Sequence, residues 1–228
     1  MPDTYYQAKL FPLQDTILHI LQDMDLSFYL TGGTALARCY LNHRYSDDLD
    51  FFTNADPDFK TECTRAVDRL KHESGWTVEV GTVADTFVRV MLEKEAALLK
   101  IDFVNDVPFY SGAIETCTIF HRVDNWLNIL SNKLCSLSRR DVKDLTDIIF
   151  IARTYEFNWP DVFAEAKQKD LWVEPLEVCK IINEFPPQLF DTIRWINPVD
   201  VEVLKAHLQD IHDDIFWGKT NIPDKLSR

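Results

Sequence analysis

The spacing of the apolar residues changes near residue 120, and this change limits the possible folds more than any other feature. Before that point, short runs of apolar and β-branched residues are typical of strands: 27–30, 48–53, 76–83, 86–92 and 97–104. After it, apolar residues recur at helical spacing: 123–137, 142–155, 160–168, 174–184 and 199–212. We therefore predict an α+β fold with a core domain at residues 1–120 and a helical domain at residues 121–228.

Within the first domain, apolar residues at 6–23 and 57–72 have the period of amphipathic helices. The last three strand-like runs are separated only by short polar segments, which predicts an antiparallel meander. The sheet should therefore have at least four strands with helices beside it. The chain end from Gly218 onward is expected to be a loosely held tail.

The charge balance excludes one large class of function. The chain has 228 residues, with 24 Lys and Arg against 37 Asp and Glu, and a formal net charge of −13. Proteins that coat duplex DNA need dense basic surfaces, so any contact with nucleic acid here should be local. The five cysteines form no CxxC pair, which favours reduced thiols. No apolar run reaches the roughly 18 residues of a membrane span, so we expect a soluble, cytoplasmic protein without membrane contact.

Two acids at strand spacing give the first indication of chemistry. Asp48 and Asp50 are two residues apart in a predicted strand, so both side chains lie on one face and can share a divalent cation. A chain with this many acids contains roughly six acid-x-acid pairs by chance, so the pair alone is weak evidence. The alternating apolar residues Leu49 and Phe51, which point to the core, make it more specific.

A pair of glycines precedes these acids in the same stretch of chain. Gly32, Gly33 and Thr34 fall between a predicted strand and a predicted short helix. Without side chains, the glycine backbone lets a ligand approach, and the first amides of a helix can meet an anion such as a triphosphate. A plain strand-to-helix turn would use the same residues, so the glycines gain meaning only beside the carboxylates.

A third acid completes a set suited to phosphoryl transfer. Asp102 lies in the apolar strand LLKIDFV, where an isolated charge is costly unless a cation or metal accompanies it. Carboxylates that hold two metal ions roughly 4 Å apart are the common way to activate an attacking hydroxyl and bind a triphosphate. An exposed aspartate at the end of a strand is the alternative.

The segments GGTALAR, HRYSDDLDFF and the later strand with Asp102 together resemble polymerase-β-type nucleotidyltransferases, and among them the AbiEii/AbiGii toxin family. The resemblance covers most of the chain. It implies a nucleotidyltransferase core with a mixed or antiparallel sheet and flanking helices, followed by a helical half that contributes to the active site. It also implies Mg²⁺, or Mn²⁺ as an alternative, bound by Asp48, Asp50 and Asp102, with an NTP as substrate.

A downstream motif of the family is matched by KLCSLSRRDVKDLTD, residues 133–147. The resemblance implies that Lys133 binds the nucleotide phosphates and that a later acid, Asp144 or Asp147, is required for activity. Spacing supports a cationic helix face, because Lys133 and Arg140 are seven residues apart. Acids at the start of a helix are favoured by its dipole without any function, so Asp144 leads Asp147 by motif alignment alone.

Arg44 and Ser46 in HRYS also match the family pattern, which implies contact with the nucleotide or with the acids, although a surface arginine is a simpler explanation. The implied function is transfer of NMP from an NTP, with release of pyrophosphate, to an acceptor hydroxyl. By resemblance the chain would be the toxin of a toxin–antitoxin or abortive-infection system, with tRNA or another RNA as acceptor and an antitoxin or repressor as partner. An RNA acceptor predicts a positive groove bordered by four basic residues: Lys133, Arg139, Arg140 and Lys143.

Two alternatives remain open from the sequence. The first keeps the chemistry and changes the acceptor to a cationic aminoglycoside, which a pocket rimmed by Asp47, Asp106 and Asp124 would attract. The second is a catalytically idle module that binds a nucleotide or a protein. Failure of the purified protein to bind Mg²⁺ and any NTP, with Asp48→Ala behaving like the wild type in every assay, would support this second alternative.

Overall fold

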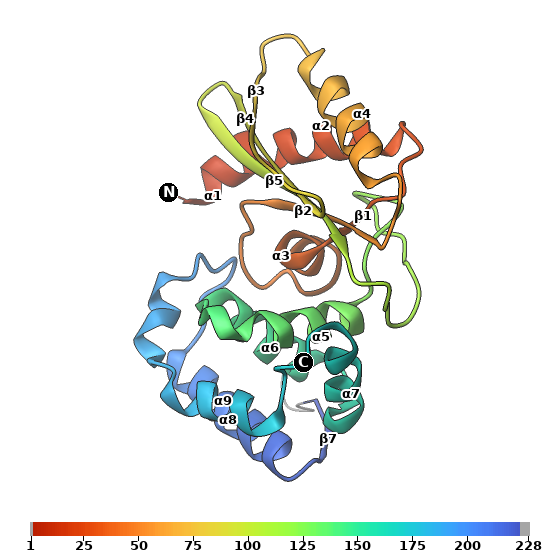
Figure 1. Cartoon of the computed structure of the whole chain (residues 1–228). Coiled ribbons are helices and arrows are strands. Elements are labelled where there is room, and N and C mark those ends of the chain that lie inside the picture. The colour runs from red at the N-terminus through yellow and green to blue at the C-terminus, as the bar shows by residue number, and fades with distance from the viewer. Residues whose placement is uncertain (1, 224–228) are drawn as a thin grey trace. The chain divides into compact units, whose positions relative to one another are not determined.

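The computed structural model of the protein describes residues 2–223. The chain forms two compact units that divide between Asn125 and Trp126. The first unit contains a five-stranded sheet with helices, and the second is almost entirely helical (Figure 1). The predicted α+β class is confirmed. Among residues 2–223, no helix is long and apolar enough to cross a membrane.

The sheet of the first unit has the strand order β1-β2-β5-β4-β3. Its strands are β1 (Tyr29–Thr31), β2 (Leu49–Asn54), β3 (Thr77–Val83), β4 (Phe87–Lys94) and β5 (Ala97–Asp106). The expected meander is present, because β3, β4 and β5 pair consecutively and antiparallel. Strand β2 then pairs parallel with β5 and antiparallel with β1, so the sheet is mixed.

Helices border both sides of this sheet. The N-terminal helical run comprises α1 (Pro2–Tyr5), the π-helical turn η1 (Tyr6–Leu10) and α2 (Phe11–Gln22), and α4 spans Phe59–Lys71. In Figure 1, α2 and α4 lie on one side of the sheet and α3 (Gly32–Ala35) lies on the other. The π-helical turn η2 (Leu36–Leu41) continues α3.

Alternating residues of the strands form the apolar core of this unit. Leu49, Phe51, Ile101 and Phe103 are fully buried, and the rings of Phe51 and Phe103 stack with their centroids 5.5 Å apart. Side chains alternate along a strand, so burial of this face turns the intervening polar residues to the opposite face. The core therefore fixes the direction of Asp50 and Asp102.

The five cysteines are not all reduced, which corrects the expectation from the sequence. Cys39 of η2 and Cys117 form a disulfide, with Cα atoms 5.8 Å apart, whereas Cys63, Cys135 and Cys179 are free thiols. The two partners are 78 residues apart and belong to no spacing motif. They meet because the segment after β5 returns to β1, where Leu30 donates a backbone hydrogen bond to Arg122 and accepts one from Asp124.

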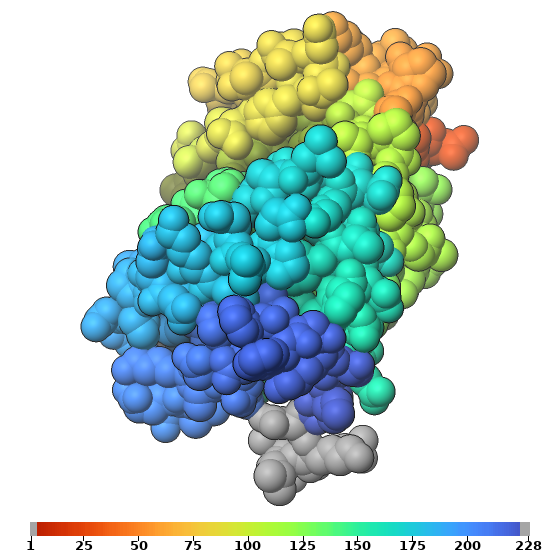
Figure 2. Space-filling model, turned by 60° about the horizontal axis from the view of Figure 1, so that its bottom comes forward, coloured from red at the N-terminus to blue at the C-terminus, as the bar shows by residue number. Residues whose placement is uncertain are grey.

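The second unit packs helices α5 to α9. Their bounds are α5 (Trp126–Ser136), α6 (Val142–Thr154), α7 (Trp159–Lys169), α8 (Pro175–Glu184) and α9 (Val201–Phe216), with short 3-10 turns at η3 (Leu137–Arg139) and η4 (Pro187–Thr192). Figure 2 shows part of the surface that α7, α8 and α9 form. Trp159, Leu134 and Phe190 are fully buried in this unit, so it has a core of its own.

The expectation of a loose tail is wrong for part of the chain end. Strand β7 (Thr220–Asn221) pairs antiparallel with β6 (Phe157–Asn158). Asn221 is buried, and its amide donates hydrogen bonds of 2.7 Å to the backbone oxygens of Ala152 and Tyr155. A buried amide with two acceptors anchors the chain here. The rest of the expected tail, residues 224–228, lies outside the described residues.

Candidate functional site

The strand register gathers polar residues into one row across the sheet. Asp50 of β2 lies opposite Asp102 of β5, Asp102 lies opposite Arg89 of β4, and Asp50 lies opposite Thr31 of β1. Side chains of directly opposed residues share a face of the sheet. Asp48 immediately precedes β2 and is two residues from Asp50. The structure thus brings the three predicted acids to one region of the first unit.

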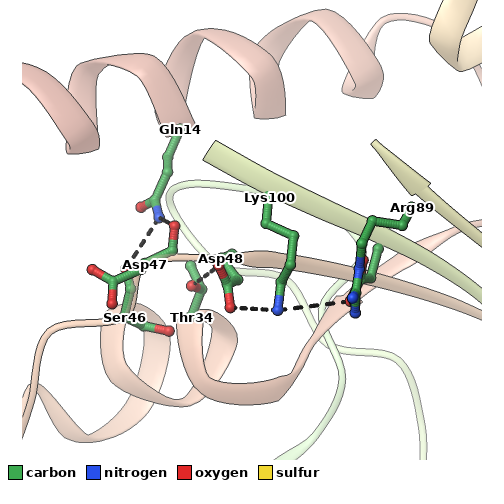
Figure 3. A network of polar contacts seen from close by, with 8 residues as sticks. Gln14, Thr34, Ser46, Asp47, Asp48, Arg89 and Lys100 are labelled. Carbon is green, nitrogen blue, oxygen red and sulfur yellow. Dashed lines mark hydrogen bonds and ion pairs between the residues drawn. The ribbon is translucent and has the colours of Figure 1, made fainter. Parts of the chain in front are cut away.

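Two cations from neighbouring strands contact these acids. Arg89 makes a two-pronged contact with Asp102, with Nε–Oδ1 and Nη2–Oδ2 distances of 2.8 Å. Lys100 of β5 places its Nζ 2.7 Å from Oδ2 of Asp48 and 3.8 Å from Oδ2 of Asp102. Figure 3 shows Lys100 reaching Asp48 on one side and the Arg89 region on the other. We call Asp48, Asp102, Arg89 and Lys100 the sheet-face cluster.

The acids keep both cations of the sheet-face cluster charged. Burial lowers the pKa of Lys100, but its hydrogen bond to Asp48 and the charges of Asp48, Asp102 and Asp50 outweigh burial and raise that pKa. The pKa of Arg89 is also raised, chiefly by its hydrogen bonds to Asp102. Each protonated side chain offsets part of the negative charge that three neighbouring carboxylates bring together.

The two glycines lie close against the predicted site residues. Gly32 has φ of +68°, and a Cβ there would collide with the carboxylate of Asp50. A Cβ at Gly33 would lie 2.6 Å from Nη2 of Arg44 and 2.9 Å from Oγ of Ser46. The turn from β1 into α3 therefore lies directly against Asp50 on one side and the HRYS segment on the other.

Thr34, Arg44 and Ser46 support the strand that carries the acids. The hydroxyl of Thr34, fully buried, donates to the backbone oxygen of Asp48. Arg44 is 2% exposed and donates to the backbone oxygen of Tyr45 over 3.1 Å, so it is not the surface arginine that was the simpler expectation. Ser46 is also buried. The side chains of Thr34 and Arg44 thus hydrogen-bond to the backbone of the loop before β2, and Ser46 is a buried residue of that loop.

The N-terminal helical run also contacts the loop before β2. These contacts were not predicted from the sequence. The buried amide of Gln14 donates to the backbone oxygens of Ser46 and Asp47 at 3.1 and 3.4 Å (Figure 3). Tyr6 stacks on Tyr45 with centroids 4.0 Å apart, and its hydroxyl donates to Asp47. A glutamine on the apolar face of a helix was the signal, because a buried polar group needs a partner.

Asp124 is a buried acid that orders the end of β1. It is fully buried and accepts hydrogen bonds from the hydroxyls of Thr31 and Tyr110 at 2.6 and 3.0 Å. Burial first, and the charge of Asp124 second, raise the pKa of Tyr110 and of Tyr29, so both phenols stay neutral donors. Asp124 therefore does not line the rim of a pocket, and the carboxylate of Asp47 accepts a hydrogen bond from Tyr6.

The downstream motif forms an ionic cluster inside the second unit. Nζ of Lys133 on α5 lies 2.8 Å from Oδ1 of Asp144 and 2.7 Å from Oδ2 of Asp147, both on α6. Arg139 adds a contact of 2.8 Å to Oδ2 of Asp144. The side chains of Lys133, Asp144 and Asp147 are 11%, 3% and 0% exposed. We call these four residues the buried cluster; three of them are buried, and Arg139, whose side chain is 64% exposed, reaches Asp144 from the surface.

Arg140 does not share a helix face with Lys133, which corrects the expectation from their spacing. Helix α5 ends at Ser136, and Arg140 has a left-handed φ of 56° after the 3-10 turn. Its guanidinium pairs with Glu184 of α8 at 2.6 Å. Lys133 and Arg139 thus share Asp144 as a common partner, whereas Arg140 points to a different helix. Seven-residue spacing places side chains together only in an unbroken helix.

The sheet face has the donor chemistry that Mg²⁺ prefers, because carboxylate oxygens are its usual protein ligands. In the structure these oxygens face Lys100 and Arg89. Within residues 2–223, no three His, Cys, Asp or Glu side chains are arranged as a ready metal site. Asp48, Asp50 and Asp102 fit a divalent cation by residue type and by the sheet face that they share. A cation bound there would share or replace the contacts of Lys100.

Solved structures with this fold include nucleotidyltransferases. MenT4, a nucleotidyltransferase toxin from Mycobacterium tuberculosis, superposes with a TM-score of 0.68 at 17% identity, covering 95% of this chain and 86% of that one. JHP933 from Helicobacter pylori superposes with a TM-score of 0.57 at 22% identity, covering 92% of this chain and 93% of that one. At these identities the likeness shows the fold.

The family of this protein follows from a match to the sequence model of a protein family. The model described as "Nucleotidyl transferase AbiEii toxin, Type IV TA system" matches residues 18–172, which is more than half of the chain. The protein belongs to this family of nucleotidyltransferase toxins, as the resemblance of its motifs predicts. A comparison with curated proteins gives no match.

Proposed function

We propose that this enzyme transfers NMP from an NTP to an acceptor hydroxyl in a reaction that depends on Mg²⁺, with Mn²⁺ as an alternative, and that releases pyrophosphate. The observation that carries the proposal is the register of Asp50 and Asp102 on parallel strands, with Asp48 two residues away and Gly32 packed on Asp50. Three acids beside a glycine turn suit a metal-bound triphosphate.

Asp48, Asp50 and Asp102 would hold the metal, which when bound offsets the charge of the triphosphate and of the attacking oxygen. Asp102 would also orient the acceptor hydroxyl and accept its proton. Gly32 and Gly33 leave room for the phosphates, while Thr34, Arg44 and Ser46 act in nucleotide binding by bracing this turn and the loop before β2. A braced loop keeps the carboxylates in place without reorganisation during the reaction.

For the second unit, we propose that Lys133 binds phosphate oxygens and that Asp144 and Asp147 position its ammonium. Both acids contact Lys133, so the geometry supports a role for each. Arg140 is the weakest member of the proposed nucleotide-binding set, because Glu184 already pairs with it. In this proposal residues 121–228 form a second domain, which would contribute Lys133 to phosphate binding.

We propose an RNA acceptor, such as tRNA, for a cytoplasmic toxin with a cognate antitoxin. Membership of a toxin family supports the partner. The four basic residues expected around an RNA do not all gather, since Arg140 turns to Glu184, so local contact with one RNA end fits better than a broad basic groove. The aminoglycoside alternative has less support, because Asp124 is buried and hydrogen-bonded to Thr31.

The test is transfer of label from each α-labelled NTP to total tRNA, to aminoglycosides and to the protein itself in the presence of Mg²⁺. We expect labelled tRNA, and at least a ~100-fold lower rate for Asp50→Asn, since a lost metal ligand removes several kcal/mol of charge stabilisation. Asp85→Asn, an exposed acid paired with Lys60, is the matched control and should keep full activity. Label transfer that survives Asp50→Asn would contradict the mechanism. NTP binding without transfer to any acceptor would indicate an idle module that binds a nucleotide, and no NTP binding at all would indicate an idle module that binds a protein.

A further inference from the structure

Lys100 lies where the carboxylates of the sheet face converge. Lys100 and Asp102 are two residues apart on β5, so their side chains share a face of the sheet. The ammonium contacts Oδ2 of Asp48 at 2.7 Å and approaches Oδ2 of Asp102 at 3.8 Å. It is the cation that bridges the acid before β2 to the acid of β5.

A divalent cation bound by the same two acids would need the same oxygens. Mg²⁺ binds carboxylate oxygen at about 2.0–2.1 Å, so an ion shared by Asp48 and Asp102 must occupy the space that the ammonium of Lys100 faces. Two cations that close repel each other strongly in a partly buried site. The ammonium and the divalent ion therefore exclude each other.

The two cations of the sheet face differ in their freedom to move. Arg89 holds both oxygens of Asp102 through a rigid fork, and it approaches from β4. Lys100 has a flexible four-carbon stem and a single close contact. Its side chain is 30% exposed and that of Arg89 is 41% exposed, so the contacts and the stem distinguish the two cations, and exposure does not. Lys100 can leave its partners without any change in the backbone, and Arg89 can stay.

We propose that Lys100 is a built-in countercation that holds Asp48 and Asp102 until a divalent cation replaces it, and that its displaced ammonium then contacts the triphosphate. The inference rests on the proposed function. In this role Lys100 couples the binding of the metal to the binding of NTP. The metal binds weakly alone and more tightly with NTP, because the triphosphate offers the ammonium new anionic partners.

The experiment measures Mn²⁺ binding by electron paramagnetic resonance, without and with a non-hydrolysable NTP. Lys100→Met should bind Mn²⁺ alone at least ~10-fold more tightly than the wild type, because the competing charge is gone. The gain in Mn²⁺ affinity that the NTP analogue produces should shrink in this variant. Lys100→Arg keeps the charge and should stay close to the wild type in Mn²⁺ affinity.

Lys60→Met is the matched control, since it removes one positive charge from an exposed pair with Asp85 and should leave the Mn²⁺ affinity within ~2-fold. If Lys100→Met does not fold, the wild type can be tested by reductive ¹³C-methylation. The NMR signal of Lys100, assigned by its loss in Lys100→Arg, should then shift when Mg²⁺ binds.

The outcomes separate this inference from the proposed function. Mn²⁺ binding that requires Asp50 but is unchanged or weaker in folded Lys100→Met would overturn the role of Lys100 and leave the enzyme mechanism standing. An NMR signal of Lys100 that does not move with bound Mg²⁺ would overturn it as well. Failure of every form of the protein to bind Mn²⁺, even with NTP, would overturn both.

Discussion

The two ionic clusters of this protein have the same plan and different surroundings. In each, one lysine bridges two aspartates and one arginine contacts one of those aspartates. In the sheet-face cluster the side chains of Lys100 and Asp48 are 30% and 33% exposed, whereas in the buried cluster those of Lys133 and Asp147 are 11% and 0% exposed. The distances differ too: Lys133 is nearly equidistant from its acids, and Lys100 is not.

The difference in exposure determines how strongly the ion pairs of each cluster hold together. Exposed ion pairs contribute about 0–1 kcal/mol, so water can replace either partner at little cost. Removing one member of a buried pair leaves an uncompensated charge and costs about 3–5 kcal/mol. The sheet-face cluster is therefore suited to exchanging its cation for a ligand. The buried cluster is suited to holding one lysine in a fixed position.

The largest effect should come from breaking the buried cluster. We expect Asp147→Ala to lower the free energy of unfolding by up to about 3–5 kcal/mol, because Lys133 loses a fully buried partner and keeps only Asp144 of its two acids. Asp48→Ala should cost less than about 1 kcal/mol, since both members of its pair with Lys100 reach solvent. Urea unfolding in EDTA, followed by circular dichroism, measures both. Equal losses for the two variants would show that burial is not what separates the clusters.

A smaller effect tests how tightly the glycine turn is fitted to the sheet face. Gly32 and Gly75 both have positive φ, +68° and +78°, but a Cβ at Gly75 would meet nothing within 4 Å. Alanine at either position should cost about 1–2 kcal/mol for its left-handed backbone. Gly32→Ala should cost about 1–3 kcal/mol more for the collision with Asp50, and it should also weaken Mn²⁺ binding.

Gly75→Ala is thus the matched control for Gly32→Ala, with the backbone strain present and the contact absent. Thermal unfolding and Mn²⁺ titration of the two variants measure the difference. If Gly32→Ala binds Mn²⁺ as the wild type does, the turn does not position Asp50, and the sheet-face cluster is less constrained than the packing indicates.

Local patterns in the sequence predict most of the fold and part of the site. Alternation in DLDFF and LLKIDFV fixes which face carries Asp50 and Asp102, because apolar residues must turn to the core. The same alternation could have revealed Lys100, which shares a face with Asp102. The pairing of Arg89 with Asp102 depends on the register of β4 against β5, which no local pattern contains.

Contacts between distant segments could not be read from the sequence. The disulfide of Cys39 and Cys117 and the hold of Gln14 on Ser46 depend on how the chain returns to β1 and β2. The prediction that Arg140 shares a helix face with Lys133 is wrong for a local reason, because helix α5 ends at Ser136. A seven-residue spacing gives no sign of where a helix ends.

The smallest effect is the salt dependence of single ion pairs, and it separates the clusters without any ligand. Double-mutant cycles give the coupling energy of Lys100 with Asp48 and of Lys133 with Asp147. We expect less than about 1 kcal/mol for the first pair and a larger value for the second. In 1 M NaCl the Debye length falls to about 3 Å, so the partly exposed pair of Lys100 and Asp48 should lose half or more of its coupling, while the pair of Lys133 and Asp147 keeps most of its own. The exposed pair of Lys60 and Asp85 calibrates full screening. If the coupling of Lys133 with Asp147 falls by the same fraction, salt and water reach both clusters alike, and cation exchange at the sheet face needs a cause other than exposure.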